Sequence, residues 1–267
     1  MAAGRCSTRM RTNLRFRSTV LPTAAALAEE AAQRFARAAS GAIRSHGDFV
    51  VALSGGTTPR SLYARLAEPP YRSTVPWSEV AVLWSDERCV PPDDAASNYR
   101  MARDILLDHV PIPPANVHRI RGEDDPAAAA RAYEQTLRRV LRTPQGPPRD
   151  APGARVDLVL LGLGDDGHTA SLFPGAPAVT DGDPWVVAHY VAAVSQWRVT
   201  LTPAIINAAT EILFLVSGAG RAAIVRRVLE GPRQPDELPA QRIAPADGRV
   251  HWLLDEAAAR DLGRASP

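Results

Sequence analysis

The sequence predicts one α/β domain built on a doubly wound, mainly parallel β-sheet with helices on both faces. Three observations support this prediction. Short, continuously apolar runs recur along the chain, and helical stretches separate them. Such runs are typical of strands buried on both faces of a parallel sheet. Polar segments, several of them rich in glycine, follow the runs directly, where the loops of such a fold lie.

The first half of the chain alternates strand and helix. Apolar periodicity and turn residues predict these elements, in order: a weakly alternating strand Leu14–Val20, an alanine-rich helix of about Thr23–Ser45, a strand Phe49–Leu53, a helix Arg60–Ala67, a strand Val80–Trp84, a shorter strand Asn116–Ile120 and a helix around Pro126–Leu141.

The second half continues the alternation. Strands are expected at Asp157–Leu161, Glu211–Val216 and Val250–Leu254, and Asp255 is expected to cap a final helix. Thr143–Arg155 is rich in proline and glycine and is the one candidate linker. In this Rossmann-like arrangement the loops at the carboxyl ends of the strands gather in one crevice, where ligands bind.

The composition excludes several classes of protein. No lysine occurs, and all 31 basic residues are arginine, so Schiff-base, Walker-A and pyridoxal chemistry are excluded. With 45% hydrophobic residues and a net charge of +2, general disorder is excluded too. Cys6 and Cys89 are too few for a disulfide framework or a cysteine-based zinc site, which favours a reducing cytoplasm. No apolar run is long enough to span a membrane.

The N-terminal segment carries a concentration of positive charge. Residues 1–19 contain five arginines and no acid, so the remaining chain sums to −3. Such a start is typical of a transit peptide or a nucleic-acid-binding arm. Because no apolar segment follows it, we expect residues 1–13 to be a disordered extension and residues 14–267 to form the single domain. The slightly acidic remainder argues against a nucleic-acid partner.

Ser54–Pro59 is the first candidate site. Gly55 and Gly56 let backbone N–H groups approach an anion, Thr57 and Thr58 add hydroxyls, and the helix that follows favours negative charge at its start. The segment therefore suits a phosphate group, although a tight turn with a helix cap fits the same residues.

Two segments match the dinucleotide fingerprint, Gly162–Gly167 and Gly218–Ala223. The first would turn two carboxylates toward a pyrophosphate, and the second lacks the acidic residue that binds the ribose, so neither supports NAD(P) binding. The first segment leads into His168, which a glycine-rich turn at a strand end presents as a general base. Asp166 is the candidate to orient it.

Three arginines complete the candidate site. Arg88 follows Asp86 and Glu87 at a strand end, where a guanidinium would stabilise developing negative charge and one of the two carboxylates would orient it. Arg198 and Arg221 flank other loops expected at the same edge of the sheet. With the Ser54–Thr57 segment they could clamp a phosphate. No histidine–carboxylate pair has helical metal-ligand spacing on these loops, so no metal is expected.

Taken together, these segments resemble the 6-phosphogluconolactonase family of the glucosamine/galactosamine-6-phosphate isomerase superfamily. The matching stretches are Leu53–Pro59, Trp84–Arg88 with Ser97–Tyr99, Gly162–Pro174, Arg198–Thr202 and Ser217–Arg221. The order and spacing of the resemblance run from about residue 14 to 256, so the loop at Thr143–Arg155 is not expected to divide domains.

The resemblance implies a fold of the sugar-phosphate isomerase type and a cofactor-free and metal-free hydrolysis of 6-phospho-D-glucono-1,5-lactone, the second step of the oxidative pentose phosphate pathway. It implies that His168 is the base that activates water, that Arg88 lies at the reacting centre, and that Ser54, Gly55, Gly56, Thr57, Arg198 and Arg221 hold the phosphate. The family often has lysine at the position of Arg221, so the phosphate geometry there is open. The expected partner is the small sugar-phosphate lactone, and the chain is expected to be a monomer or weak homodimer.

Two alternatives have other chemistry. Glucosamine-6-phosphate deaminases have a similar fold but read Asp-Glu-Tyr where this chain has Asp86-Glu87-Arg88, and they carry a proton-transferring glutamate where it has Leu172-Phe173-Pro174. A sugar-phosphate sensor would need neither His168 nor Arg88 and would be expected to carry an added DNA-binding helix pair. Both alternatives fit the sequence less well.

Overall fold

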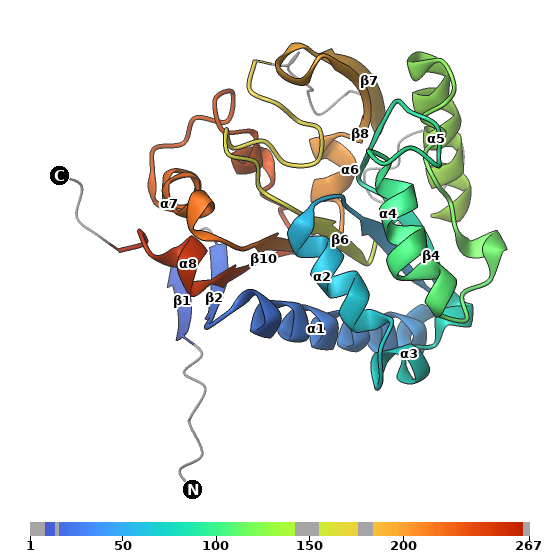
Figure 1. Cartoon of the computed structure of the whole chain (residues 1–267), viewed down its shortest axis with the longest axis horizontal. Coiled ribbons are helices and arrows are strands. Elements are labelled where there is room, and N and C mark those ends of the chain that lie inside the picture. Colours follow the sequence, from blue (N-terminus) through green and yellow to red (C-terminus); the bar gives the residue numbers. More distant parts are fainter. Residues whose placement is uncertain (1–8, 14–15, 142–154, 176–183, 264–267) are drawn as a thin grey trace, which may run out of the picture.

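The computed structural model describes residues 9–13, 16–141, 155–175 and 184–263 (Figure 1). Within them the main sheet has seven strands in the order β1-β2-β10-β9-β6-β3-β4, of which only β1 is antiparallel to its neighbour. The strands are β1 (Arg9–Asn13), β2 (Phe16–Leu21), β3 (Phe49–Leu53), β4 (Val80–Trp84), β6 (Leu158–Leu161), β9 (Glu211–Val216) and β10 (Arg249–Asp255).

A second, antiparallel sheet continues from the carboxyl end of β4. It has the order β5-β8-β7, with β5 (Asp86–Arg88), β7 (Val186–Val191) and β8 (Gln196–Leu201). Ser85 joins the two sheets, because its N–H donates to Leu53 O and its carbonyl accepts from the N–H of Leu201. The polar residues that follow β4 are thereby held as a strand.

The helices cover both faces of the main sheet. They are α1 (Ala24–His46), α2 (Thr57–Leu66), α3 (Tyr71–Thr74), α4 (Asn98–Ile105), α5 (Pro126–Val140), α6 (Pro203–Asn207), α7 (Ala222–Glu230) and α8 (Glu256–Ala259). Crossovers between parallel strands are right-handed, so the strand order assigns α1 and α2 to one face and α5, α6 and α7 to the other. This confirms the predicted fold class.

The core lies between these layers. The side chains of β3 and β6 are all buried, as are nearly all of β4, β9 and β10. Phe35 of α1 meets Phe49 edge to face with ring centroids 5.3 Å apart, and Phe214 stacks on Trp252 at 3.8 Å. Buried aromatic side chains dominate the energetics of such cores, so α1 is fixed against the sheet by apolar contact.

The chain reverses its winding between β3 and β6. The connection that leaves β3 runs to β4 on one side, whereas the connection that leaves β6 runs to β9 on the other, although β3 and β6 are neighbours. In open α/β sheets this reversal leaves a crevice outside the carboxyl ends of the strands, where ligands bind. The segments that follow β3 and β6 are the two glycine-rich loops.

Several predicted elements are confirmed at their predicted ends. Strands Phe49–Leu53, Val80–Trp84 and Glu211–Val216 agree residue for residue, and Asp255 accepts the N–H of Ala258 as the cap of α8. Each of the three strands is buried among neighbours, which is the environment that a continuous apolar run indicates.

Other predictions differ from the structure. The expected strand Asn116–Ile120 is wrong: Pro114–Asn116 forms a short 3₁₀ helix, and only Val117 bridges to Val82. The expectation of a disordered start is wrong for Arg9–Asn13, whose backbone pairs antiparallel with β2 and so gains a hydrogen-bonded edge. Residues 1–8 lie outside the described residues, as does the candidate linker apart from Arg155.

In the part of the chain that the structure describes, no helix combines the length and the apolar character that crossing a membrane requires.

Buried His251 predicts an acid-sensitive stability. It lies on β10, is 8% exposed, and its Nε2 is 2.7 Å from Thr19 Oγ1 of β2. Burial, helped by the charges of Arg34 and Arg17, lowers the pKa of His251 from 6.5 to about 4. The unfolded chain therefore binds a proton below about pH 6.5 that the folded chain does not bind until about pH 4, and the stability from the neutral ring is lost across that window.

We expect denaturant unfolding to show this loss as a difference between the wild type and His251→Gln. Going from pH 7.5 to pH 4.5, the wild type should lose about 2–3 kcal/mol more unfolding free energy than the variant, because glutamine does not titrate. Equal losses in the two proteins would show that His251 is not the titrating group.

Candidate active site

The loop after β3 forms one wall of the site. Its backbone is fixed by buried Tyr63 of α2, whose hydroxyl donates to Ser54 O at 2.7 Å and accepts from the Ser54 N–H at 3.0 Å. Gly56 precedes α2 with φ 106°, a left-handed conformation that glycine adopts without strain, and no side chain caps the helix. The first N–H groups of α2 are thus left for an anion.

Two side chains extend this wall. The hydroxyl of Ser54 is buried without a partner and borders the cavity described below, and Thr58 Oγ1 lies 2.9 Å from Ser217 Oγ of the loop after β9. Asn98 covers Gly55 so closely that an added Cβ at Gly55 would lie 2.0 Å from Asn98 Oδ1. A glycine is therefore required at position 55 for close packing.

The loop after β6 presents the imidazole of His168. Its Nδ1 lies 2.6 Å from Asp166 Oδ1, and its backbone N–H donates to the same oxygen at 3.0 Å. The ring stacks on Phe173 with centroids 4.2 Å apart. An Nδ1–H donated to the carboxylate leaves Nε2 as the basic nitrogen, the arrangement that a general base needs.

Glycine at position 164 makes room for this ring. An added Cβ there would lie 2.0 Å from His168 Nδ1 and 2.1 Å from Cε1, whereas an added Cβ at Gly162 meets no atom within 4 Å. The two glycines of one loop thus have different roles, and only Gly164 is needed to seat His168.

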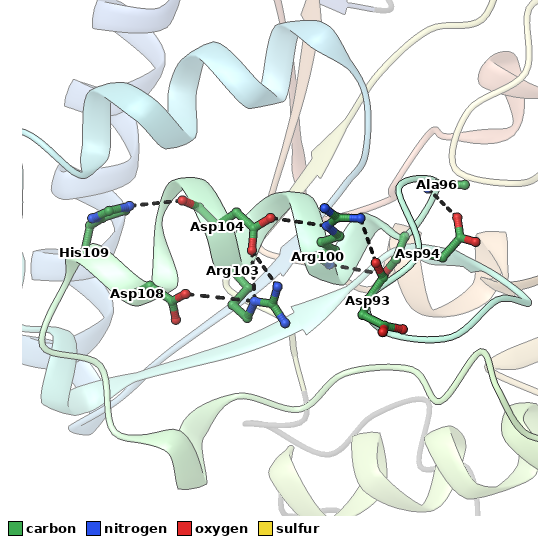
Figure 2. A network of polar contacts seen from close by, with 9 residues as sticks. Asp93, Asp94, Ala96, Arg100, Arg103, Asp104, Asp108 and His109 are labelled. Atoms are coloured by element: carbon green, nitrogen blue, oxygen red, sulfur yellow. Dashed lines mark hydrogen bonds and ion pairs between the residues drawn. The ribbon is translucent and has the colours of Figure 1, made fainter.

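Arg88 lies on β5 at the far side of the site. Its Nη1 donates to Ala96 O, while its Nε is buried without a partner. Figure 2 shows how the segment around Ala96 is held: Asp94 Oδ1 accepts the Ala96 N–H at 2.7 Å, and Arg100 Nη1 donates to Asp93 O at 2.7 Å. The guanidinium is therefore placed by a backbone carbonyl.

This corrects the expectation that Asp86 or Glu87 orients Arg88. Glu87 instead accepts the backbone N–H groups of Arg88, Asn98 and Tyr99, so it caps the start of α4. Burial raises the pKa of Glu87, and those N–H donors act against the increase. Asp86 binds Ser171 Oγ and Asn98 Nδ2. Neither carboxylate contacts the guanidinium, because the β5 backbone directs each of them elsewhere.

The other two arginines are placed differently from each other. Arg221 borders the cavity and pairs with Asp165. Arg198 lies on β8 directly opposite Arg88 in the antiparallel register, is 8% exposed, and does not border the cavity. Arg198 thus does not line the cavity in this arrangement, because β8 buries it beside Arg88, and its clamp on the phosphate stays a prediction. Burial, and then the charge of Arg88, lower the pKa of Arg198.

The loops enclose a cavity of about 400 Å³. It brings together the predicted Ser54, Gly55, Gly56, Thr57, Arg88, His168 and Arg221. Asp166 contacts His168 but does not border the cavity. Sequence reasoning gave no role to three polar residues that also border the cavity, Asn98, Thr169 and Ser217. The position of Asn98 directly after a helix-capping serine was the available signal, but it does not reveal which loop the side chain covers.

The fold and the cavity define an α/β protein in which an uncapped helix start, suited to an anion, and an imidazole oriented by a carboxylate face one cavity. Residues 22–252 match the family of glucosamine-6-phosphate isomerases/6-phosphogluconolactonase, and the chain belongs to that family.

Known proteins agree with this assignment. The 6-phosphogluconolactonase of Synechocystis sp. is 41% identical over 83% of this chain and 88% of its own length. That of Haemophilus influenzae is 37% identical over 79% and 87%. The solved structure of 6-phosphogluconolactonase from Trypanosoma cruzi is 29% identical, covers 95% of this chain and 99% of its own, and has a TM-score of 0.81.

Proposed function

We propose that this protein hydrolyses 6-phospho-D-glucono-1,5-lactone to 6-phospho-D-gluconate, in the second step of the oxidative pentose phosphate pathway. The observation that carries the proposal is one cavity holding an uncapped helix start with two glycines and, facing the same space, an imidazole oriented by a carboxylate. The first suits a phosphate and the second suits a base, so the substrate should carry a phosphate and a reactive centre.

His168 acts on water in this proposal. Its Nε2 takes a proton from a water molecule whose oxygen attacks the lactone carbonyl carbon, and Asp166 stabilises the resulting imidazolium. Arg88 offsets the charge on the carbonyl oxygen of the tetrahedral intermediate. The bond from the carbonyl carbon to the ring oxygen then breaks, and the ring oxygen takes the proton back from His168. An ester of this reactivity needs no covalent nucleophile, metal or cofactor.

The phosphate binds at the other end of the cavity. Ser54, Gly55, Gly56 and Thr57 offer backbone N–H groups and hydroxyls, and Arg221 adds positive charge once its contact with Asp165 opens. A cytoplasmic location, no nucleic-acid partner, and a monomer or weak homodimer belong to the same proposal.

Deamination of glucosamine 6-phosphate is the alternative within the family. It is disfavoured because Phe173, which cannot transfer a proton, stacks on His168 where the deaminases have a glutamate. Freshly prepared 6-phosphogluconolactone, coupled to oxidation of 6-phosphogluconate with the spontaneous rate subtracted, tests the proposal. We expect catalysed hydrolysis and no ammonia release from glucosamine 6-phosphate. Ammonia release without lactone hydrolysis would overturn the proposal.

A further inference from the structure

Ser171 anchors the segment that follows His168. It is 1% exposed and is bonded to all three strands of the small sheet. Its hydroxyl donates to Asp86 Oδ2 at 2.7 Å, its N–H donates to Thr200 Oγ1 at 3.2 Å, and His189 Nε2 lies 2.7 Å from its carbonyl oxygen. The preceding Ala170 has φ 49°, a left-handed conformation that is strained for a residue with a Cβ. The bonds of Ser171 hold this turn closed.

Asp86 connects the same segment to Ser54–Thr57, the proposed phosphate-binding residues after β3, which we call the phosphate loop. Besides the bond from Ser171, its carboxylate lies 3.3 Å from Asn98 Nδ2, and its backbone carbonyl accepts from the same nitrogen at 2.9 Å. The amide of Asn98 in turn packs against Gly55. Apart from the hydroxyl of its neighbour Ser85 at 3.4 Å, this buried carboxylate contacts two side chains, of which one holds the His168 segment and the other covers the phosphate loop.

The charge of Asp86 is what allows it to hold both. A carboxylate is only an acceptor, so it can take a hydrogen from Ser171 and from Asn98 at once. An asparagine of the same shape would turn an amide donor toward one of these two donors and lose that contact, and its neutral oxygen would hold the other donor more weakly than a carboxylate does. Arg198 lies close enough for its charge to interact with that of Asp86, which offsets the cost of burying the carboxylate.

We propose that Asp86 is a positioning residue that joins the base to the phosphate loop, with Ser171 as the arm that fixes His168 and Asn98 as the arm that fixes Gly55. The inference rests on the proposed function, because its roles are those of a base and a phosphate site. Loss of the Ser171 arm should misplace the base and lower kcat. Loss of the Asn98 arm should loosen the phosphate loop and raise KM.

Three variants separate the two arms by steady-state kinetics on the lactone. We expect Ser171→Ala to lower kcat by about tenfold or more with KM within twofold, since a small misplacement of a catalytic group is costly. Asn98→Ala should raise KM by about fivefold or more with kcat within threefold, and Asp86→Asn should do both. In the Asp86→Asn/Ser171→Ala double variant, kcat should fall no further than in Asp86→Asn, because the two changes break one connection.

Calorimetric binding of inorganic phosphate provides a second readout that does not need turnover. Asn98→Ala and Asp86→Asn should weaken phosphate binding by about fivefold or more, while Ser171→Ala leaves it unchanged, given the direct contact of Asn98 with the phosphate loop. Thr136→Ala, which removes an exposed hydroxyl bonded within α5, is the control and should match the wild type in every assay.

The outcomes are distinct. Additive losses of kcat in the double variant, or phosphate binding unchanged by Asp86→Asn, would overturn the inference. Equal effects of Ser171→Ala and Asn98→Ala on KM and kcat would overturn it as well, because they would indicate general loosening of the fold. If the wild type does not hydrolyse the lactone, the proposed function fails, and the phosphate measurement alone decides whether Asp86 supports the loop.

Discussion

His168→Ala is expected to lower kcat for lactone hydrolysis by about 10²–10⁴-fold, the usual contribution of a positioned general base. KM should change by much less, because the phosphate loop follows β3, whereas His168 follows β6, and the loop does not contact the imidazole. Since the side chain of His168 is about one third exposed, its removal leaves no buried cavity, and the variant should fold. The coupled assay, with the spontaneous rate subtracted, measures the effect.

His109→Ala is the matched control. His109 is exposed beyond α4 and does not border the cavity; its Nε2 lies 3.0 Å from Asp104 O (Figure 2). We expect wild-type kcat in this variant. Retention of more than about a tenth of wild-type kcat in His168→Ala would contradict the assignment of the base, since a base contributes at least about 10²-fold, and would direct the search to Asp166.

Gly164→Ala is expected to reduce kcat by about 10²-fold or more while the protein stays folded. The added methyl would occupy the place of the imidazole, with its carbon 2.0 Å from Nδ1, so the ring must leave Asp166 and the face of Phe173. A displacement of about 1 Å in a catalytic group can cost about 10²-fold. Kinetics together with a thermal unfolding curve would measure the effect.

Gly162→Ala isolates the steric cause, because Gly162 borders the same cavity on the same loop but its added Cβ meets no atom within 4 Å. It should keep kcat within about threefold of the wild type, as surface-like substitutions without clashes usually do. Similar losses in the two variants would show that the loop tolerates no alanine for reasons unrelated to His168.

Three of the parallel strands, β3, β4 and β9, could be predicted from the sequence to the residue, whereas the small sheet could not. Phe49–Leu53 is apolar throughout because both of its faces are covered, and a short apolar run between turn residues is typical of such a strand. Asp86–Arg88 forms a strand although all three residues are charged, since its backbone pairs with β8 from more than 100 residues away. Such long-range pairing leaves no local pattern in the sequence.

The candidate site was predictable to a similar degree. The glycine-rich loops and His168 follow strands directly, so the fold class alone brings them to one edge of the sheet. The position of Arg198 depends on its register in the small sheet, which places it beside Arg88 and away from the lining of the cavity. The contacts of Asp86 with Ser171 and Asn98 depend on the same sheet, and therefore appear only in the structure.

The central claim is that one cavity joins a phosphate site to a hydrolytic base, and the phosphorylated and unphosphorylated gluconolactones test it most directly. The phosphate should form two or three charge-assisted hydrogen bonds worth about 1.5–3 kcal/mol each. We therefore expect kcat/KM to be at least about 10²-fold higher for 6-phosphogluconolactone than for the unphosphorylated lactone. Equal values of kcat/KM would contradict the account, because the loop after β3 would then contribute nothing to substrate recognition.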